Sequence, residues 1–448
     1  MEVVSSLDPT GIDVSAALLI PHNLLESPTQ IVIVGQKSSR DMADIDLYAE
    51  YGIPDDMRPA VSSLLDIDAR SPLIAAEMRS DAPSVKNLVK EYDAVLPLGI
   101  SRKYVERRGF DELKALREIV QNALDETEEV SGKPDVSLRQ DDLGLWVADE
   151  GRGLPVEALS MGASDKRCWM RGYYGEGLKL AAGYFALSGF PVYVFAKGKV
   201  YKFVFVPRDS HNPKLHAVLG RSSRRSTGTE VLVQGFRVES ATCDRLISFR
   251  NKELQGKKIA EVLSESEECP HPKPSTIYDH PNLLYIRNMY VGESSEVAKR
   301  KSLFSYDLWW FRLDVSRTLM TYSVPSLFRE ASKVFEKSPK ALRRYAEKLA
   351  ETGMIRVETG REGTAIRLDP TFGIFEGHLF IYAVPEGLLE AALSVLNMSD
   401  KEKLVGLTSS AAEAREGMKR GLLPLIVSEE ISNYFKNIPR LQNLMRDS

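Results

Sequence analysis

The sequence has little cysteine and almost no net charge. Three cysteines occur in 448 residues, far apart and without a Cys-x-x-Cys pair, which argues against a small disulfide-stapled fold and a cysteine-based zinc site. The 59 Lys and Arg residues are offset by 63 Asp and Glu residues, for a net charge of −4. Binding to nucleic acid through bulk positive charge is therefore disfavoured, although a local basic patch is not.

Long apolar runs are also missing. The longest uncharged stretch, residues 180–196, is interrupted by Gly189 and Pro191. It is shorter than the ~20 apolar residues that a membrane-spanning helix needs. The first residues show no basic region followed by an apolar run, which is the pattern of a signal peptide. We therefore expect no membrane association and a cytoplasmic location.

What is present is an ordinary globular composition, with 43% hydrophobic and 27% charged residues, as is usual for folded domains. The length corresponds to about three domains at roughly 150 residues each. In residues 1–93 we predict a strand at Gln30–Val34 and a helix at Leu64–Arg79, without recognisable chemistry. The remaining sections are residues 94–245, which carry the motifs described below, residues 275–335, a second domain, and residues 336–448, mainly helical.

Residues 94–245 alternate between helical and strand patterns. Apolar residues recur every three and four positions from about Phe110 to Val130, which predicts an amphipathic helix. A second helix is predicted at Gly175–Leu187. Strands are predicted at Asp135–Arg139, Leu143–Ala148, Val192–Phe195, Val200–Val206 and Thr229–Val233. This order of helix, hairpin, loop, helix and meander predicts an α+β sandwich, with helices on one face of a mixed β-sheet.

Four short motifs follow one another in this section. Glu118 and Asn122 are four residues apart and share a face of the first helix. Asp149-Glu-Gly-Arg-Gly ends the second strand, Gly172-Tyr-Tyr-Gly-Glu-Gly-Leu-Lys opens the second helix, and Thr227-Gly-Thr precedes the last strand. Glycines after a carboxylate let the backbone close around a ligand, and the free N–H groups at a helix start suit phosphate.

This ordered set resembles the N box, the two glycine boxes and the final Gly-Thr element of the GHKL superfamily. That superfamily includes the DNA gyrase B subunit, MutL, the ninety-kilodalton heat-shock chaperone and the histidine kinases. The resemblance covers about residues 94–240 and implies the Bergerat nucleotide-binding fold. Residues 96–104 resemble the lead-in of uncharacterised microbial and phage members. The region that follows the ATPase domain in these members is matched more loosely. The matching segments here are Tyr285–Val291, Phe304–Leu308 and Leu313–Arg317, and this resemblance implies a transducer-like domain at 275–335.

The resemblance implies ATP and Mg²⁺ as cofactors and gives roles to individual residues. Asp149 would accept the adenine amino group, Thr229 would support adenine through its hydroxyl, and Asn122 would hold Mg²⁺. The glycines would let the backbone pass close to the nucleotide, and Lys179 either approaches phosphate or is a surface lysine. The binding residues implied in this way are Asn122, Asp125, Asp149, Gly151, Gly153, Gly175, Gly177, Leu178, Lys179 and Thr229.

Glu118 distinguishes the branches of this superfamily. The ATPase branch has Glu four residues before the magnesium asparagine, as the general base for the attacking water, a role that needs a carboxylate within reach of that water. The one histidine before the domain, His22, does not lie in a phosphoacceptor-like helix. The resemblance therefore implies ATP hydrolysis that drives a conformational or dimerisation switch. A nucleotide-binding module without turnover and a histidine-kinase-like phosphotransferase are the alternatives.

The last section suggests one further function. Ser326–Thr352 is predicted as one long helix, and it is followed by a hairpin with the basic turn Thr359-Gly-Arg-Glu-Gly. A helix and a basic-tipped hairpin, here residues 338–368, are the outline of a winged helix. DNA binding is one interpretation, and a plain helix–hairpin packing unit is the other. No motif identifies a DNA or protein client.

Overall fold

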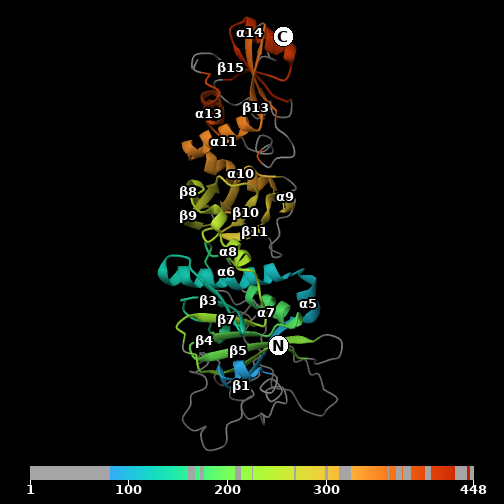
Figure 1. The fold of residues 1–448 in the computed structure, drawn as a ribbon, viewed down its shortest axis with the longest axis vertical. Helices are drawn as coiled ribbons and strands as arrows, with labels where there is room; N and C mark the ends of the chain where they lie inside the picture. The colour runs from blue at the N-terminus through green and yellow to red at the C-terminus, as the bar shows by residue number, and fades with distance from the viewer. Residues whose placement is uncertain are drawn as a thin grey trace, which may run out of the picture. The chain divides into compact units, whose positions relative to one another are not determined.

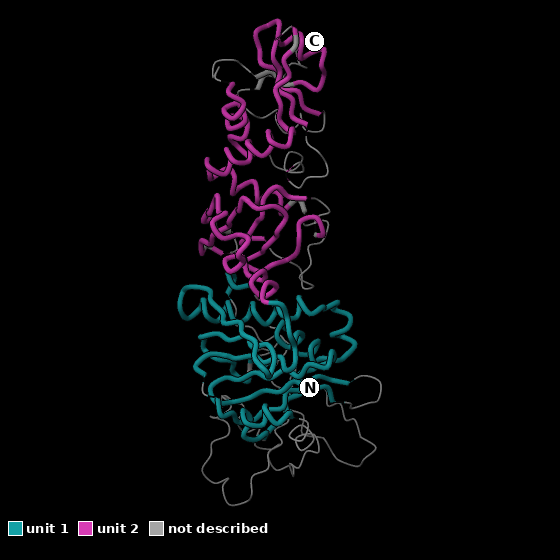
Figure 2. The backbone as a smooth tube through the Cα atoms, in the orientation of Figure 1, with its two compact units in different colours: residues 1–239 teal, residues 240–448 magenta. Residues whose placement is uncertain are grey.

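The structure is a computed structural model, and it divides into two compact units, residues 1–239 and 240–448 (Figure 2). The predictions at Gln30–Val34, Leu64–Arg79, Gly175 and Leu313–Arg317 lie outside the described residues. No helix within the described ranges is long and apolar enough to cross a membrane. The described residues are 81–159, 167–171, 176–206, 213–224, 226–266, 269–297, 301–311, 324–361, 363–369, 376, 385–398, 405–428 and 441–443.

Unit 1 is built on a seven-stranded sheet with the order β1-β6-β5-β4-β7-β3-β2. Every neighbouring pair in this sheet is antiparallel. The five predicted strands are present, and β1 and β6 were not predicted. The strands are β1 (Val89–Ser101), β2 (Ser137–Asp141), β3 (Gly144–Ala148), β4 (Val192–Ala196), β5 (Lys199–Val206), β6 (Lys214–Ser222) and β7 (Thr229–Gln234).

Helices α6 (Glu112–Ser131) and α7 (Gly177–Leu187) lie together on one side of this sheet (Figure 1). Asp111 caps α6, because its carboxylate accepts from the N–H of Lys114 at 2.7 Å, and Gly132 ends the helix at φ +75°. The apolar positions that recur every three and four residues along α6 are buried. The predicted α+β sandwich, with helices on one face of a sheet, is confirmed, but the sheet is antiparallel throughout the described strands and not mixed.

The opposite face of the sheet has its own core. Trp146, Tyr193 and Phe195 on this face are almost completely buried in one apolar cluster. Asp81 lies in the same region and accepts from the hydroxyls of Tyr92 and Tyr193 and from Lys202 Nζ, which is 2.6 Å away. Two short helices, α4 (Pro83–Lys86) and α5 (Arg102–Arg107), flank β1. β1 begins at Val89, so the sheet starts within the section predicted as residues 1–93.

Unit 2 contains a first sheet with the order β11-β10-β12-β9-β8. β10 and β12 pair in parallel, and the other neighbours are antiparallel. α9 (Ser294–Val297) follows β11, and α8 (Ser240–Arg245) and a short 3₁₀ helix (Lys252–Leu254) precede β8. The strands are β8 (Lys258–Ser266), β9 (Cys269–Tyr278), β10 (Leu283–Ile286), β11 (Met289–Glu293) and β12 (Ser305–Leu308).

Two helices stand where one long helix was predicted. α10 (Val324–Glu336) and α11 (Pro339–Glu351) are separate because Ser338 accepts from the N–H of Ala341 as an N-cap and Pro339 occupies the first helical position. Proline there starts a helix well but cannot continue one from the preceding turn. Aromatic side chains join α10 and α11 to the first sheet: Phe335 stacks on Tyr345 at 4.6 Å, and Phe304 contacts both rings.

A second sheet lies in residues 336–448, where mainly helical structure was predicted. Its order is β13-β14-β16-β15-β17. The predicted hairpin is present as β13 and β14, but β14 also pairs in parallel with β16, so the hairpin is part of a sheet and not a projecting wing. The elements are β13 (Ile355–Gly360), β14 (Gly363–Leu368), α13 (Leu388–Val395), β15 (Val405–Thr408), α14 (Ala411–Lys419), β16 (Leu423–Ile426) and β17 (Leu441–Asn443).

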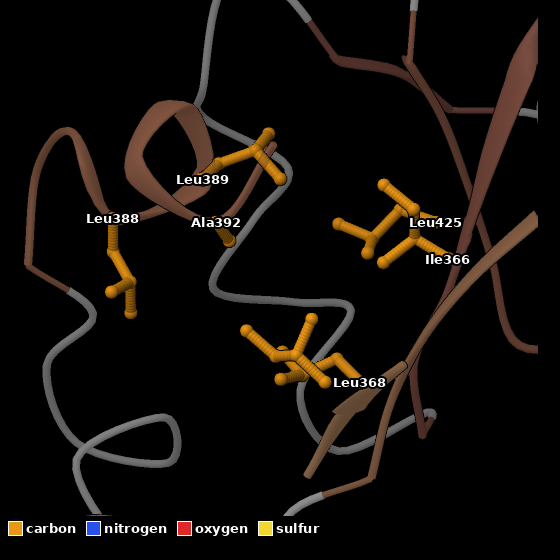
Figure 3. Close-up of a pocket in the computed structure, with 7 residues that line it drawn as sticks. Ile366, Leu368, Leu388, Leu389, Ala392 and Leu425 are labelled. Carbon is orange, nitrogen blue, oxygen red and sulfur yellow. The ribbon is translucent and has the colours of Figure 1, made fainter. Parts of the chain in front are cut away.

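An apolar cavity separates α13 from this sheet (Figure 3). Leu388, Leu389 and Ala392 line it from the helix, and side chains including Ile366 and Leu425 line it from the strands. The space is small, with a cavity volume of about 20 Å³, and its lining residues carry no polar side chain. It is a small, partly open apolar gap between α13 and the strands of unit 2.

Candidate functional site

Asp149 lies at the end of β3, where β3 pairs with the start of β7. The register places Ala148 opposite Glu230, so Asp149 lies beside Thr229. The backbone N–H of Asp149 donates to the carbonyl of Thr229 at 2.9 Å. The carboxylate Oδ1 accepts from the N–H of Thr229 at 3.0 Å and from the N–H of Gly151 at 2.8 Å. Two of the four sequence motifs therefore meet directly at this carboxylate.

Two glycines permit this close approach. A Cβ at Gly228 would lie 2.1 Å from the backbone oxygen of Asp149, and a Cβ at Gly151 would lie 2.5 Å from Cβ of Glu126. Neither contact can be relieved by turning a side chain, since one involves backbone and the other a Cβ atom on α6. Any other residue at either position would push β3, β7 and α6 apart. Gly151 and Gly228 thus allow close packing around the Asp149 carboxylate.

The carboxyl group of Asp149 is half-buried, and burial raises its pKa to about 6. The hydrogen bonds from Thr229 and Gly151 oppose this rise because they stabilise the charged form, whereas the negative charge of Glu126 adds to it. At neutral pH the group is ionised and accepts hydrogen bonds. Such a carboxylate at a strand end can accept a donor from a small molecule.

Glu118 and Asn122 lie one turn apart on α6. Nδ2 of Asn122 donates to the backbone carbonyl of Glu118 at 2.8 Å, which directs the amide oxygen away from that carbonyl. The Glu118 side chain is buried at 3% exposure. Its Oε2 lies against the first residue of α7, because a Cβ at Gly177 would be 2.1 Å from this oxygen. The first and third motifs therefore also meet directly.

The first turn of α7 carries the remaining residues of the third motif. The N–H of Leu180 donates to the Glu176 carbonyl at 2.9 Å, so the first turn of the helix consists of Gly177, Leu178 and Lys179. Lys179 is not a surface lysine: it is 1% exposed, and its Nζ donates to the carbonyl of Ala158 at 3.1 Å. Burial lowers the pKa of Lys179 to about 8, against the opposing charge of Glu176.

Asp125 forms a buried ion-pair cluster that the sequence did not predict. Its Oδ1 accepts from the backbone N–H of Arg171 at 2.8 Å and lies 3.3 Å from Nη1 of the same arginine. That Nη1 also donates to Glu128 Oε2 at 2.7 Å. All three side chains are at most 5% exposed. Asp125 therefore has a structural role, because it connects Arg171 to α6.

Three more residues near Asp149 were missed. Arg152 forms a two-point ion pair with Glu126, at 3.0 and 2.9 Å, and both residues stand inside or beside motifs that were recognised. Lys197, at the β4–β5 turn, lies over Gly153, whose φ of +77° favours glycine. A Cβ at Gly153 would lie 3.1 Å from Cε of Lys197. No local sequence signal marks Lys197, because only strand pairing brings it to this position.

No group of three His, Cys, Asp or Glu side chains in the described part of the chain is placed to hold a metal ion. A Mg²⁺ ion that arrives with a nucleotide does not need such a group, since it usually takes one or two protein ligands and keeps phosphate and water as the others. Asn122 fits the role of a single ligand. Its amide nitrogen is used within the helix, so its oxygen is the atom directed outward.

No model of a known protein family and no curated protein matches the sequence. Among solved structures, one similar chain is the topoisomerase IV ATP-binding domain of Francisella tularensis in complex with a small molecule inhibitor. The similarity has a TM-score of 0.25 and 13% identity, over 71% of this chain and 91% of that chain. A TM-score this low is no basis for assigning a family, and the proposal below is built on the residues of this chain.

Proposed function

We propose that residues 94–245 bind ATP with Mg²⁺ and hydrolyse it. One observation carries this proposal: the four motifs, which lie far apart in the sequence, form one continuous set of contacts. Thr229 contacts Asp149, and Gly151 packs on Glu126 of α6. On the same helix Asn122 follows Glu118, which lies against the start of α7. This set joins a carboxylate acceptor, a magnesium ligand, a general base and a helix start.

Each part suits one portion of the nucleotide. Asp149, ionised at neutral pH, would accept the adenine amino group, and Thr229 would support the base beside it. The first N–H groups of α7 would bind phosphate oxygens, which helix N-termini favour through their dipole. Asn122 would hold Mg²⁺, which neutralises phosphate charge. Glu118, beside the start of α7, would meet the water that attacks the terminal phosphorus.

The reaction is the transfer of the terminal phosphoryl group to water. A water oxygen forms a bond to the γ-phosphorus while the bond from that phosphorus to the bridging oxygen breaks, which gives ADP and phosphate. Glu118 would accept the proton that the water loses, and general-base catalysis of this kind contributes about 10²–10⁴-fold. We further propose that ATP strengthens self-association, as a nucleotide-driven switch acting on a DNA or protein client in the cytoplasm.

The winged-helix interpretation of residues 338–368 receives no support from the arginines on the hairpin strands. Arg356 and Arg367 on the hairpin both pair with Glu358, at 3.2 and 2.8 Å, and Arg356 also pairs with Asp369. Paired cations are less available to phosphates of a nucleic acid backbone. Direct DNA binding by this hairpin is therefore not part of the proposed function.

The decisive experiment compares the wild-type protein with Asp149→Asn. Calorimetry with ATP and Mg²⁺ should show binding by the wild type, and binding should fall below detection in the variant, because the amide can present N–H groups to the adenine amino group. Light scattering with a non-hydrolysable ATP analogue should show a larger mass for the wild type alone. Tight ATP binding by Asp149→Asn would remove this residue from the adenine role, and an unchanged mass would remove the dimerisation switch.

A further inference from the structure

Gly177, the first residue of α7, lies in close contact with the carboxylate of Glu118. A β-carbon built on Gly177 would be 2.1 Å from Oε2 of Glu118, 3.1 Å from its Cδ and 3.5 Å from its Cβ. Non-bonded heavy atoms pack best at about 3.5–4 Å. The Glu118 side chain is also buried. A side chain at residue 177 and the carboxylate in its present position therefore exclude each other.

The backbone does not explain why residue 177 is glycine. Gly177 is not among the described glycines with a positive φ, and it begins a regular helix that continues to Leu187. Alanine forms helices better than glycine does, so α7 starts with a residue that is unfavourable for a helix. The reason is steric, because the oxygen of Glu118 occupies the space that a β-carbon would take.

The contact at Gly177 differs in kind from those at Gly151 and Gly228. At Gly228 a Cβ would meet the backbone of Asp149, and at Gly151 it would meet the Cβ of Glu126, so the main chains would have to separate. At Gly177 a Cβ would meet the end of a flexible side chain. A methyl group there displaces a carboxylate and leaves α6 and α7 in place.

We propose that Gly177 is a positioning residue for the general base, because its missing side chain provides the space that the Glu118 carboxylate occupies at the start of α7. This inference rests on the proposed function, in which Glu118 accepts the proton of the attacking water. The sequence resemblance implies another role, in which the glycine lets the backbone pass close to the nucleotide. If the glycine makes room for the ligand, its substitution costs ATP affinity. If it makes room for Glu118, the substitution costs turnover.

Gly177→Ala separates these two roles. Turnover at saturating ATP should fall by about 10²-fold, the effect of a small misplacement of a catalytic group, and by no more than in Glu118→Ala. Calorimetric affinity for a non-hydrolysable ATP analogue should equal that of the wild type, because the displaced carboxylate leaves room for the ligand. Adenosine affinity should also be unchanged, since Asp149 keeps its contacts.

The matched control is Gly183→Ala. It makes the same chemical change in the same helix, but the new Cβ would lie 3.1 Å from a methyl carbon of Val105 on α5 and does not meet Glu118. Its unfolding temperature measures the effect of tighter packing on α7. Its turnover should equal that of the wild type at a temperature where both proteins are folded.

The double variant Glu118→Ala/Gly177→Ala tests whether Gly177 acts through Glu118. It should hydrolyse ATP at the rate of Glu118→Ala, since the group that Gly177 positions is already gone. Thermal unfolding tests the contact without any nucleotide. In the wild-type background the new methyl group has to displace a carboxylate, whereas in the Glu118→Ala background it only improves the helix. Gly177→Ala should therefore raise the unfolding temperature more in the second background than in the first.

Three results would overturn the inference while leaving the proposed function intact. They are wild-type turnover in Gly177→Ala, a loss of ATP affinity in this variant with adenosine affinity unchanged, and the same shift of unfolding temperature in both backgrounds. A double variant that is slower than Glu118→Ala would also overturn it, because Gly177 would then act independently of Glu118. If the wild-type protein does not hydrolyse ATP, the proposed hydrolysis fails and this inference fails with it.

Discussion

Two carboxylates, one in each compact unit, have similar acidity in different surroundings. Burial raises the pKa of Asp149 to about 6 and that of Glu376 to about 7. Asp149 is half-buried and receives two backbone N–H groups on one oxygen. Glu376 is fully buried and accepts from the N–H groups of Leu303 and Phe304 and from the hydroxyl of Tyr306.

The difference lies in access. Glu376 is surrounded by donors of its own chain, and it ties its segment to β12 and to α11, where the Tyr345 hydroxyl donates to its backbone carbonyl. Asp149 stands at a strand end among glycines, where a small molecule can supply a donor. A raised pKa alone therefore does not identify a functional site. The exposure of the carboxylate and the donors around it decide whether it can bind a ligand or only forms structural contacts within the chain.

Glu118 does not fit the division between a partly exposed ligand-binding carboxylate and a buried structural one. Its substitution has the largest expected effect, which is on ATP turnover. The Glu118 side chain is almost as buried as that of Glu376, but it lies on α6, the helix of the candidate site, against the start of α7. Glu118→Ala should slow ATP hydrolysis by about 10²–10⁴-fold, the usual contribution of a general base. ATP affinity should stay the same, because Asp149 and Asn122 remain. Turnover at saturating ATP and calorimetric affinity measure the two quantities.

The matched control for Glu118 is Glu112→Ala. Glu112 is an exposed acid in the first turn of the same helix, so its loss tests whether any change of charge on α6 slows the reaction. Turnover in this control should equal that of the wild type. Wild-type turnover in Glu118→Ala as well would leave a nucleotide-binding module without this general base.

Glu376→Ala should act on stability alone. The substitution leaves the N–H groups of Leu303 and Phe304 and the hydroxyl of Tyr306 without their acceptor, and a buried donor left unsatisfied costs about 1–3 kcal/mol. Thermal unfolding should therefore begin at a lower temperature, while ATP affinity should not change. A loss of ATP affinity at a temperature where the variant remains folded would contradict the separation drawn between the two carboxylates.

The pH dependence of unfolding checks the same substitution. Because the pKa of Glu376 is raised in the folded protein, its contribution to stability is fully present below its ordinary pKa near 4.5 and is lost as pH rises through about 7. The wild type should lose this contribution across that interval. Glu376→Ala should lose less stability between the same two values. Parallel curves for both proteins would remove Glu376 as the titrating group.

Asp149 predicts a pH effect on binding. Protonation below a pKa of about 6 removes the negative acceptor, so affinity should fall as the pH falls. Between pH 7 and pH 5 adenosine should bind about tenfold more weakly, since one pH unit below the pKa leaves about one group in ten ionised. Adenosine is the suitable probe because it has no phosphate that titrates in this range. Constant affinity over the interval would contradict the assignment.

The smallest expected effect comes from the cavity in unit 2. Ala392→Val places two methyl groups at the apolar space between α13 and the sheet, and filling such a space stabilises a protein by about 0.5–1 kcal/mol when the shape allows it. Glu390→Val, at an exposed position of the same helix, measures the cost of a β-branched residue in a helix. Ala392→Val should unfold at a higher temperature than this control. A lower temperature would show overpacking.

Local patterns in the sequence predicted the centre of unit 1 well. The helix from about Phe110 to Val130 was predicted within two residues of α6, because its apolar spacing and its capping residues lie in one continuous segment. β1 was missed because Pro97 and Gly99 interrupt it, and its pairing with β6 contains bulges. Such irregular strands carry no alternating pattern.

Only those residues of the candidate site that stand in short sequence motifs could be predicted. Asp149, Asn122 and Glu118 could be found, and the structure joins them to one set of contacts. The partner of Asp125 could not be found, because Arg171 is distant in the sequence and no spacing rule links the two. The short strands β15 and β16 lie in the section that was predicted to be mainly helical, because a segment of four residues is too short to show a strand pattern until its neighbours are known.

The register between β3 and β7 sets an order of events during synthesis. Asp149 leaves the ribosome long before Thr229, whose N–H supplies one of its two hydrogen bonds and whose strand completes the sheet beside it. A nascent chain that ends before β7 therefore contains most of the motif residues but lacks one wall of the site. Contacts this distant in sequence form late in folding. Under the proposed function, nucleotide would be bound only after β7 has been made, so ATP would stabilise the finished unit without guiding the folding of its first half.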